Sequence, residues 1–281
     1  MEIKKINCEI LKKLVSHTRK LDFKNKFLLT SLKYERCGEL PYIIEILSSD
    51  FSKNYNYLDI GTGNSMLPTY LLNNSNWNIN CIDKFKWVHS QKKYFDSVCA
   101  QENLQRLKVF EHDFLQAPLK ENFYDVITNI SVIEHFEGNL DSKAMEYSAK
   151  MLKKDGIYIL TAPFNENNYK EFYVKSGVYG ENYSGAPVFF QRHYDTKNFY
   201  ERIIKPSGLK EISRIYMADY GFQFKEKLID LPLFLKPLRC LYHYFIPEFA
   251  KIFITYRDIP FSNSEMKMNT ASSIIIVLKK E

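Results

Sequence analysis

The chain has 281 residues, of which 45% are hydrophobic, and it carries a formal net charge of +6. This length supports one substantial hydrophobic core with an added subdomain. The lysines are scattered and no run of five or more basic residues occurs, so the composition argues against strong electrostatic binding of nucleic acid.

The cysteines and the N-terminal residues indicate the cellular compartment in which the protein is expected. The chain has five cysteines, an odd number, and no C-x-x-C spacing. This pattern fits reduced, mostly buried thiols, and it argues against a disulfide framework or a zinc site. The sequence MEIKKINCEILKK contains no apolar run of signal-peptide length. We therefore expect a soluble, cytoplasmic protein with no transmembrane segment.

Residues 1–34 are predicted to be helical, because apolar residues such as Ile10 and Leu14 recur at helical spacing between lysines. The sequence R-C-G-E-L-P at residues 36–41 then leads into a short apolar helix. We expect these segments to form an N-terminal helical cap over residues 1–50.

The stretch YLDIGTGN at residues 57–64 is the clearest signature of a ligand site. Residues 55–60 have the pattern of a short buried strand that runs into a tight turn. Gly61 and Gly63 allow backbone angles that a side chain would forbid, so the turn can approach a ligand closely. Ser65 is suited to cap the next helix, whose N-terminus presents backbone N–H groups to an anionic or polar ligand.

The details of this turn separate two classes of nucleotide-like ligand. A dinucleotide site has a third glycine in G-x-G-x-x-G, and this chain has Met66 at that position. Asp59 stands two places before the first glycine, and D-I-G-T-G-N resembles the first motif of class I S-adenosylmethionine (SAM) methyltransferases. An ordinary glycine turn is the alternative, because glycine pairs alone are weak signals.

Acidic residues at two predicted strand ends extend the resemblance. Residues 77–82 alternate like a strand and stop at Asp83, about 20 positions beyond the first glycine, where an acid can accept hydrogen bonds from both ribose hydroxyls. A plain turn aspartate is the alternative. The strand predicted at 107–111 is followed by Asp113 and Phe114. In the family an acid here accepts the adenine amino group, and the next residue flanks the ring.

The sequence YDVITNISVIEHF at residues 124–136 is the second strong signal. It resembles the fourth strand and following loop of small-molecule methyltransferases. In that arrangement Asn129 and Ile130 line the cofactor, while Glu134 and His135 lie near the transfer site. For His135 the alternative is a hydrogen-bonded residue that stabilises the loop. The later sequence L-K-K-D-G-I-Y-I-L-T also follows the family pattern, which makes four matches in order along the chain.

An arrangement similar to residues 36–41, R-x-x-E-[YL]-P, precedes the first motif in some bacterial methyltransferases. By that resemblance Arg36 pairs with the methionyl carboxylate of SAM, and Glu39 holds Arg36. A helix-surface ion pair at i,i+3 is the alternative.

The resemblance implies an α/β fold with a Rossmann-like, seven-stranded, mostly parallel sheet, helices on both faces and an α-helical and aromatic insertion. The last strand, residues 271–278, is expected to be antiparallel. SAM is the implied cofactor and S-adenosyl-L-homocysteine the product. The implied cofactor-binding residues are Arg36, Asp59, Gly61, Thr62, Gly63, Asn64, Asp83, Lys84, Asp113, Phe114, Asn129 and Ile130.

We expect a single methyltransferase domain over residues 1–281, with its SAM-binding core in residues 51–220 and 270–281. Residues 163–194 lack a clear periodicity, and we expect a long loop that contributes to the acceptor pocket. Residues 221–269 form an apolar insertion that charged residues and prolines interrupt, so it is not a membrane span. Core packing, a homodimer surface and an interfacial contact are its alternative roles, preferred in that order.

Methyl transfer to oxygen needs an aligned acceptor and removal of a proton. His193 and His135 are the candidate bases, because a histidine pKa lies near working pH, and Glu134 is placed to orient either ring. The H-Y-D sequence at residues 193–195 resembles bacterial methyltransferases in which the histidine enters the active site. A metal site at these three side chains is a weaker alternative, because Ser131 stands where the first carboxylate of E-x-x-E-H would be. We predict no metal.

Missing motifs narrow the acceptor. The chain has no [DNS]-P-P-[YFW] for methylation of DNA amines, no Pro-Cys pair for pyrimidine C5 and no Asp-rich loops for a catechol-type magnesium site. The preferred function is O-methylation of a small polar acceptor, such as a sugar hydroxyl or phosphoramidate in bacterial capsule or surface-polysaccharide synthesis. The acceptor is then a nucleotide-linked or capsular sugar. An RNA methyltransferase and a non-catalytic SAM-binding protein are the alternatives.

Overall fold

The computed structural model describes residues 4–25, 32–175, 186–219, 239–261 and 272–281. The chain divides into two compact units, which we call unit 1 and unit 2. Unit 1 consists of Met1–Asp113 and Met217–Asp258, and unit 2 consists of Phe114–Tyr216 and Ile259–Glu281. The expected division into cap, core, acceptor loop and insertion stays a prediction.

Unit 1 contains a parallel sheet with the strand order β3-β2-β1. Its strands are β1 (Asn56–Ile60), β2 (Asn78–Asp83) and β3 (Leu107–Glu111), close to the predicted ranges. Nearly every residue of β1 and β2 is buried, as is typical of parallel strands covered on both faces. Because parallel strands end at the same edge, the glycine turn after β1 and Asp83 at the end of β2 lie at one edge of the sheet.

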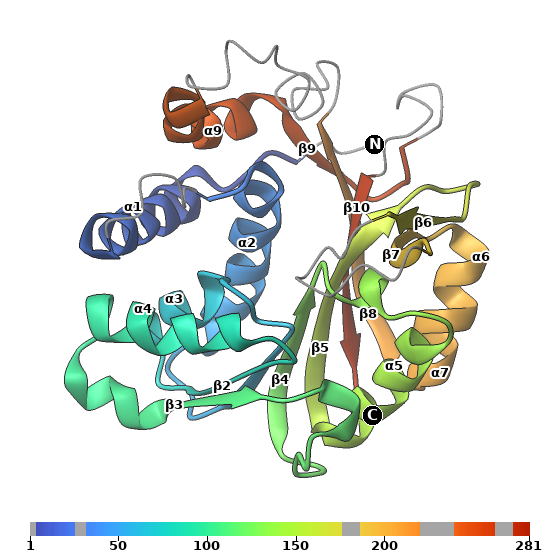
Figure 1. Ribbon diagram of the computed structural model, residues 1–281, viewed down its shortest axis with the longest axis horizontal. Coiled ribbons are helices and arrows are strands. Elements are labelled where there is room, and N and C mark those ends of the chain that lie inside the picture. Colours follow the sequence, from blue (N-terminus) through green and yellow to red (C-terminus); the bar gives the residue numbers. More distant parts are fainter. Residues whose placement is uncertain (1–3, 26–31, 176–185, 220–238, 262–271) are drawn as a thin grey trace. The chain divides into compact units, whose positions relative to one another are not determined.

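The helices of unit 1 are amphipathic. In α1 the side chains of Leu11 and Leu14 are completely buried, whereas Lys12 and Lys13 between them are exposed. This confirms the expected N-terminal amphipathic helix. The helices described in unit 1 are α1 (Cys8–Asn25), α2 (Tyr34–Leu47), α3 (Leu67–Asn74), α4 (Ser90–Val98) and α9 (Arg239–Phe253), with 3-10 turns at Ser48–Asp50, Lys86–His89 and Gln101–Arg106 (Figure 1).

Unit 2 contains strands in the order β4-β5-β10-β8. β4 (Tyr124–Ile130) is parallel to β5 (Leu152–Phe164), and β10 (Ser272–Lys279) is antiparallel to β5. The expected antiparallel last strand is therefore confirmed. β8 (Lys210–Asp219) adjoins β10, and its residues from Met217 onward belong to unit 1.

Short helices connect the strands of unit 2. Asp195 caps α6, because its Oδ1 accepts a hydrogen bond from the backbone N–H of Asn198 at 2.7 Å. The helical segments described in unit 2 are α5 (Leu140–Met151), α6 (Thr196–Phe199) and α7 (Lys205–Ser207), the 3-10 turns Phe114–Gln116 and Ile133–His135, and the π-helical turn Tyr200–Ile204.

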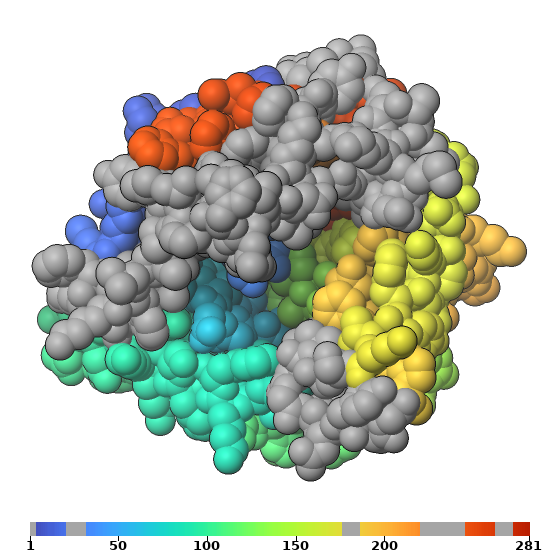
Figure 2. Space-filling view, turned by 45° about the horizontal axis from the view of Figure 1, so that its top comes forward, coloured from blue at the N-terminus to red at the C-terminus, as the bar shows by residue number. Residues whose placement is uncertain are grey.

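The stretch expected as a loop, residues 163–194, instead contains a β-hairpin. β6 (Lys170–Val174) and β7 (Val188–His193) pair antiparallel and form a separate two-stranded sheet. Both strands are rich in aromatic and β-branched residues, which favour extended backbone. Figure 2 shows this part of the chain, in yellow, at the surface. Residues 176–185 lie outside the described residues.

The expected insertion, residues 221–269, is described in part. Within it lie α9 and a short strand, β9 (Ile254–Arg257), all four residues of which are buried. The buried strand agrees with core packing, the first of the three expected roles. With β9 the described residues contain eight strands outside the hairpin, one more than expected. No helix in the described part of the chain is long and apolar enough to cross a membrane.

Candidate functional site

The glycine turn of unit 1 is fastened to the end of β2. Gly61 has a φ of 66° and Gly63 a φ of 49°, the left-handed region in which a side chain would be strained. The backbone N–H groups of Gly61 and Thr62 donate to the carbonyl oxygen of Ile82 at 2.8 and 3.1 Å. The Thr62 hydroxyl donates to the carbonyl oxygen of Asp59 at 2.8 Å. The predicted need for glycine at this turn is therefore confirmed.

Asp83 contacts the same turn. Its Oδ2 accepts the backbone N–H of Gly63 at 2.9 Å, and its Oδ1 accepts the backbone N–H of Phe85 at 2.9 Å. The residue is 9% exposed. A carboxylate oxygen can accept more than one hydrogen bond, so each oxygen is held in place and keeps the capacity to accept another donor.

Gln91 supports this turn from α4, a role that no pattern in the sequence predicts. Its Nε2 donates to the carbonyl oxygens of Gly63 and Ser65 at 3.0 and 2.9 Å, and its side chain is completely buried. A glutamine in a helix is usually exposed, so only the tertiary contact identifies it. Two side chains thus hold the glycine turn, that of Asp83 at the end of β2 and that of Gln91 in α4.

Arg36 and Glu39 form the expected ion pair within α2. The Glu39 side chain is completely buried and that of Arg36 is 28% exposed, so the alternative of a surface pair does not fit. A carboxylate buried with its cation fixes the guanidinium more tightly than an exposed pair would. The pairing of Arg36 with a ligand carboxylate stays a prediction.

The other expected cofactor residues follow the strands. Lys84 comes directly after β2, and its Nζ lies 4.8 Å from the ring centre of Phe85. Asp113 is the last residue of that part of unit 1, and Phe114 begins unit 2, where its ring packs edge-on against Tyr147 at 5.2 Å. Their roles around adenine stay predictions.

In unit 2 the chain makes a strained turn after β4. Ser131 has a φ of 51°, and its N–H donates to both the carbonyl oxygen and the hydroxyl oxygen of Thr161, each at 3.0 Å. The side chain of Asn129 is completely buried, and its Oδ1 accepts the N–H of Ile133 at 2.9 Å. The side chain of Asn129 therefore stabilises this turn. Ile130, also expected at the cofactor, is 9% exposed.

Glu134 and His135 lie together on the 3-10 turn that follows. Glu134 is 2% exposed, and its Oε1 is 3.9 Å from Nε2 of His135. Nδ1 of His135 is 2.6 Å from the carbonyl oxygen of Phe190 in β7. A carbonyl oxygen only accepts, so Nδ1 carries a proton, and in the neutral ring Nε2 carries the lone pair.

His193 lies on β7, the strand that contains Phe190, and its environment differs from that of His135. Its Nε2 is 3.2 Å from Nε2 of Gln191. An amide nitrogen only donates, so the lone pair of His193 Nε2 accepts this hydrogen bond. The ring also packs against Phe172, with the ring centres 4.4 Å apart. The hydrogen bond described for His135 is thus made by Nδ1, and the one described for His193 is made by Nε2. Among the described residues, no three His, Cys, Asp or Glu side chains gather as a metal site.

The hairpin carries a carboxylate between two tyrosines. Glu171 accepts hydrogen bonds from the hydroxyls of Tyr169 and Tyr173 at 2.6 and 3.0 Å. The hydrogen bond from Tyr169 is the main cause that lowers the pKa of Glu171. Burial and the same hydrogen bond raise the pKa of Tyr169 to about 12. Carboxylate, hydroxyls and aromatic rings together give this hairpin the chemistry to bind a polar molecule.

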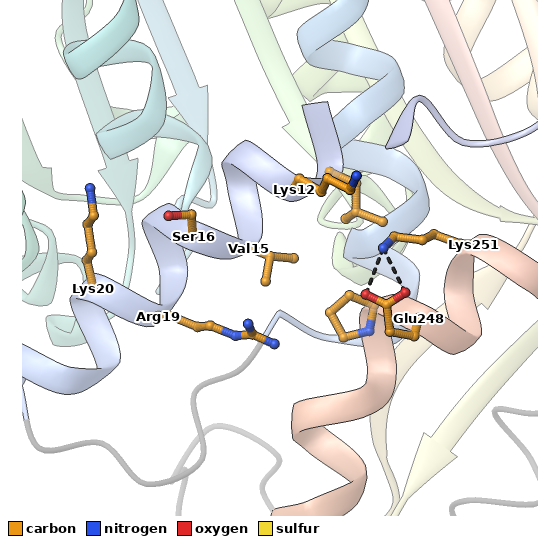
Figure 3. Close-up of a pocket in the computed structure, with 9 residues that line it drawn as sticks. Lys12, Val15, Ser16, Arg19, Lys20, Glu248 and Lys251 are labelled. Atoms are coloured by element: carbon orange, nitrogen blue, oxygen red, sulfur yellow. Dashed lines mark hydrogen bonds and ion pairs between the residues drawn. The ribbon is translucent and has the colours of Figure 1, made fainter. Parts of the chain in front are cut away.

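A groove of about 520 Å³ lies between α1 and α9 in unit 1 (Figure 3). Lys251 donates to both carboxylate oxygens of Glu248 at 2.7 and 2.8 Å, so this pair is mutually neutralised. None of the expected cofactor or catalytic residues lines the groove. Its lining residues are Leu11, Lys12, Val15, Ser16, Arg19, Lys20, Pro247, Glu248 and Lys251.

Residues 58–160 match the family model described as a methyltransferase domain. This stretch is therefore similar to methyltransferase domains. It begins in β1, contains the glycine turn, Asp83 and His135, and ends in β5. The resemblance to class I SAM-dependent methyltransferases that the motifs indicate is therefore confirmed. A search of curated protein sequences finds no match.

Solved structures share the fold at low sequence identity. Coclaurine N-methyltransferase bound to N-methylheliamine and S-adenosylhomocysteine is similar with a TM-score of 0.56, 13% identity, and coverage of 97% of this chain and 85% of the other. A putative sarcosine dimethylglycine methyltransferase from Galdieria sulphuraria has a TM-score of 0.52, 14% identity, and coverage of 85% and 83%. The [4+2]-cyclase SpnF has a TM-score of 0.54, 13% identity, and coverage of 86% and 82%.

These similarities confirm the expected fold class of the chain, a Rossmann-like and mostly parallel α/β sheet. The SpnF similarity also shows that proteins of this fold include one named for a reaction other than methyl transfer. The fold alone therefore does not decide the chemistry.

Proposed function

We propose that the chain is a SAM-dependent methyltransferase that transfers a methyl group to an oxygen of a small polar acceptor and releases S-adenosyl-L-homocysteine. The observation that carries the proposal is the fixed carboxylate of Asp83 beside the glycine turn of a methyltransferase domain. Each Asp83 oxygen accepts one backbone N–H and has capacity for another donor. The two ribose hydroxyls of SAM are such donors, so the residues present fit this cofactor.

The other cofactor contacts are proposed from their places in the chain. The glycine turn leaves room for the backbone to approach the cofactor, and the Arg36 guanidinium, held by buried Glu39, is suited to the methionyl carboxylate. Asp113 and Phe114 are proposed to contact adenine. The remaining proposed contacts are Asp59, Gly61, Thr62, Gly63, Asn64, Lys84, Asn129 and Ile130.

His135 is the base that the geometry supports best. The sulfonium of SAM supplies an electrophilic methyl carbon and a neutral thioether leaving group. With SAM bound, Nε2 of His135 would receive the proton that the acceptor oxygen loses. The ring is oriented through Nδ1, as expected of a histidine base. In His193, Nε2 already accepts from Gln191.

We propose a sugar hydroxyl or phosphoramidate of bacterial capsule or surface-polysaccharide synthesis as the acceptor, reached in the cytoplasm as a nucleotide-linked or capsular sugar. The resemblance of residues 193–195 and the segment that follows to bacterial methyltransferases supports this class. The aromatic rings of the hairpin and the carboxylate of Glu171 also suit a polar sugar, which packs on ring faces and donates hydroxyl protons.

Calorimetry followed by a transfer assay tests the proposal. SAM and S-adenosyl-L-homocysteine are expected to bind, and NAD is not. Methyl-labelled SAM is then incubated with the protein and a panel of nucleotide sugars and capsule fragments, and label is expected on oxygen in one acceptor. SAM binding with no transfer to any acceptor would favour a second candidate, a SAM-binding protein with another activity, which the similarity to a [4+2]-cyclase supports.

A further inference from the structure

The segment that carries His135 is fastened to the second strand of the hairpin. We call residues 133–141 the base loop. The carbonyl oxygen of Phe190 accepts the Nδ1 proton of His135 at 2.6 Å. Arg192 and Tyr194, two residues apart along the extended chain, contact the base loop with their side chains. The strand and the loop are therefore joined at every second residue, at Phe190, Arg192 and Tyr194, and the hydrogen bond to His135 is the first of these connections.

The Arg192 guanidinium makes the central connection. It donates to the carbonyl oxygens of Phe136 at 2.8 Å and Gly138 at 3.1 Å, and to Oδ2 of Asp141 at 2.8 Å. The side chains of Arg192 and Asp141 are both 0% exposed. A planar guanidinium has fixed donor directions, so it sets the distance and the orientation of the loop backbone relative to β7.

Asp141 collects further donors. The Tyr194 hydroxyl donates to its Oδ2 at 2.9 Å, and Arg202 donates to Oδ2 through Nε and to Oδ1 through Nη2, both at 2.8 Å. The negative charge of Asp141 is thus compensated inside the protein. Since Asp141 lies in the first turn of α5, the network also fixes the C-terminal end of the base loop.

The contacts between the base loop and β7 determine which ring nitrogen of His135 carries the proton. A neutral histidine has two tautomers, and the hydrogen bond made by one nitrogen decides which nitrogen keeps the lone pair. The Phe190 oxygen selects the tautomer of His135 in which Nε2 has the lone pair. That selection requires the loop and the strand to stay at hydrogen-bonding distance, and Arg192 holds the residue directly after His135.

We propose that Arg192, Asp141 and Tyr194 are positioning residues that hold the base loop against β7 and thereby keep the proton of neutral His135 on Nδ1. The proposal rests on the proposed function of His135 as the base. None of these three residues needs to contact the acceptor, and their role is to preserve Nε2 as the atom that receives its proton.

The ring nitrogens of His135 report the tautomer without any acceptor. The full chain is labelled with ¹⁵N-histidine, and its spectrum is recorded at a pH about two units above the reference histidine pKa. The His135 signals are identified by their absence in His135→Asn. The wild type is expected to show the Nδ1–H tautomer. In Arg192→Lys, which keeps the charge but loses the planar fork, the population is expected to move toward Nε2–H.

Tyr194→Phe removes one hydroxyl and is expected to shift the tautomer in the same direction by less. Arg106→Lys is the matched control, because Arg106 in unit 1 also donates to backbone carbonyl oxygens, those of Ser75, Trp77 and Leu72. It is expected to leave His135 unchanged. If Arg192→Lys does not fold, the tautomer of His135 in Tyr194→Phe alone tests the proposal. An unchanged Nδ1–H tautomer in the folded variants overturns the proposal.

Activity provides a separate readout. With an acceptor found, Arg192→Lys is expected to lower kcat, to leave the KM for SAM unchanged and to shift the histidine limb of the pH–rate profile. If His135→Asn keeps full methyl transfer, the proposed base is wrong. The ¹⁵N-histidine spectra of the wild type and Arg192→Lys still test the positioning role, because they report the tautomer of His135 without methyl transfer. Loss of SAM affinity in Arg192→Lys with an unchanged pH profile would instead indicate a structural role and overturn the proposal.

Discussion

Asp141 and Arg192 are charged residues that have no exposed surface. A buried ion pair contributes little net stability, because both charges lose their hydration, but removal of one partner leaves an uncompensated charge. Burial, followed by the charge of Asp141, raises the pKa of Tyr194 well above its usual range, so its hydroxyl stays protonated and continues to donate. The value of this network is therefore the local geometry that it imposes.

Asp141→Asn is expected to lower the free energy of unfolding by about 3–5 kcal/mol, because two arginines lose their counter-charge. Denaturant unfolding measures the change. Asp125→Asn is the control, since Asp125 also pairs with a cation at 2.8 Å, Lys153, which is 37% exposed. Its loss is expected to cost about 0–1 kcal/mol. Equal losses of unfolding free energy in Asp141→Asn and Asp125→Asn would show that burial of the ion pair does not determine the cost of breaking it.

Asp83→Ala is expected to weaken SAM binding by about 1–3 kcal/mol, because the ribose hydroxyls lose their acceptor and Gly63 loses the partner of its N–H. Calorimetry with SAM gives the dissociation constant. Glu111→Ala is the matched control, because Glu111 pairs with Asp83 at the end of the neighbouring strand and is exposed. Unchanged affinity in Asp83→Ala would remove Asp83 from the cofactor site.

Measurements of kcat distinguish the two candidate bases, His135 and His193. His135→Ala is expected to lower kcat by roughly 10²–10⁴-fold with SAM affinity intact, because the proton acceptor is lost. His193→Ala is expected to have the smaller effect, since Nε2 of that ring is engaged by Gln191. A larger loss in His193→Ala would exchange the two roles. Activity that a chelator stops and added metal restores would favour the metal alternative.

Single residues differ in how well the sequence predicts them. The position of Asp83 at the end of β2 agrees with the prediction, because an acid about 20 residues beyond the first glycine is typical of nucleotide-binding α/β folds, whereas its contact with Gly63 is known only from the structure. Gln91, Asp141 and Arg192 were not foreseen. Each is polar and has no local pattern, and each is buried only because a distant segment supplies its partners.

Among the helices, α1 is joined to α3 through a half-buried histidine. The Thr69 hydroxyl donates to the carbonyl oxygen of Met66 at 2.9 Å, so its oxygen accepts from Nε2 of His17, also at 2.9 Å. The ring of His17 lies edge-on to Tyr70. Burial, with a smaller contribution from Lys20, lowers the pKa of His17 to about 4. The helix is therefore packed with a neutral imidazole.

This contact gives the stability of the chain a defined pH dependence. Unfolded His17 takes up a proton near pH 6.5 and the folded form only near about 4, so the unfolded state binds more protons between these values. The stabilisation is complete above the unfolded pKa and is lost as the pH falls toward 4. We expect about 1 kcal/mol to be lost between about pH 7.5 and 5.5.

Denaturant unfolding at several pH values measures this loss. His17→Gln keeps a donor for Thr69 but does not titrate, so its stability is expected to vary less over the same interval. His112→Gln is the control, because His112 is exposed. An unchanged slope in His17→Gln would show that another group causes the pH dependence.

Elements with a strong local pattern were predicted well. The strands before and after the glycine turn appear within one residue of their expected starts, because a short run bounded by polar residues marks the first and alternation marks the second. The hairpin of β6 and β7 was expected as a loop. Its aromatic residues occur on both faces, so no alternation marks the strands, and their pairing with each other defines them.

At the scale of the whole molecule, the net charge of +6 is dispersed over the sequence. We expect weak, non-specific RNA binding at physiological salt, because few phosphates would be neutralised at once. Fluorescence anisotropy with a single-stranded RNA oligonucleotide measures this at several salt concentrations. Tight binding at physiological salt with a steep salt dependence would revive the RNA methyltransferase alternative.

The fold class follows from the resemblance to class I methyltransferases, which rests on four motifs in order along alternating strands and helices. The strand β9 was not predicted. Its sequence ITYR is only four residues long, and its burial depends on partners elsewhere, including a two-sided backbone pairing between Tyr256 and Lys4. Short strands of this kind have no sequence signature of their own.

The contacts of Arg192 and Tyr194 make the hairpin sensitive to its length. Side chains alternate between the two faces of a strand, so a shift by one residue turns every side chain to the opposite face. Deletion of a single residue between Val188 and Arg192 would move His193 to the position of Arg192 and turn the guanidinium to the opposite face, away from the carbonyl oxygens of Phe136 and Gly138. Natural variation in this strand is therefore expected as substitutions, whereas insertions and deletions should be absent from it.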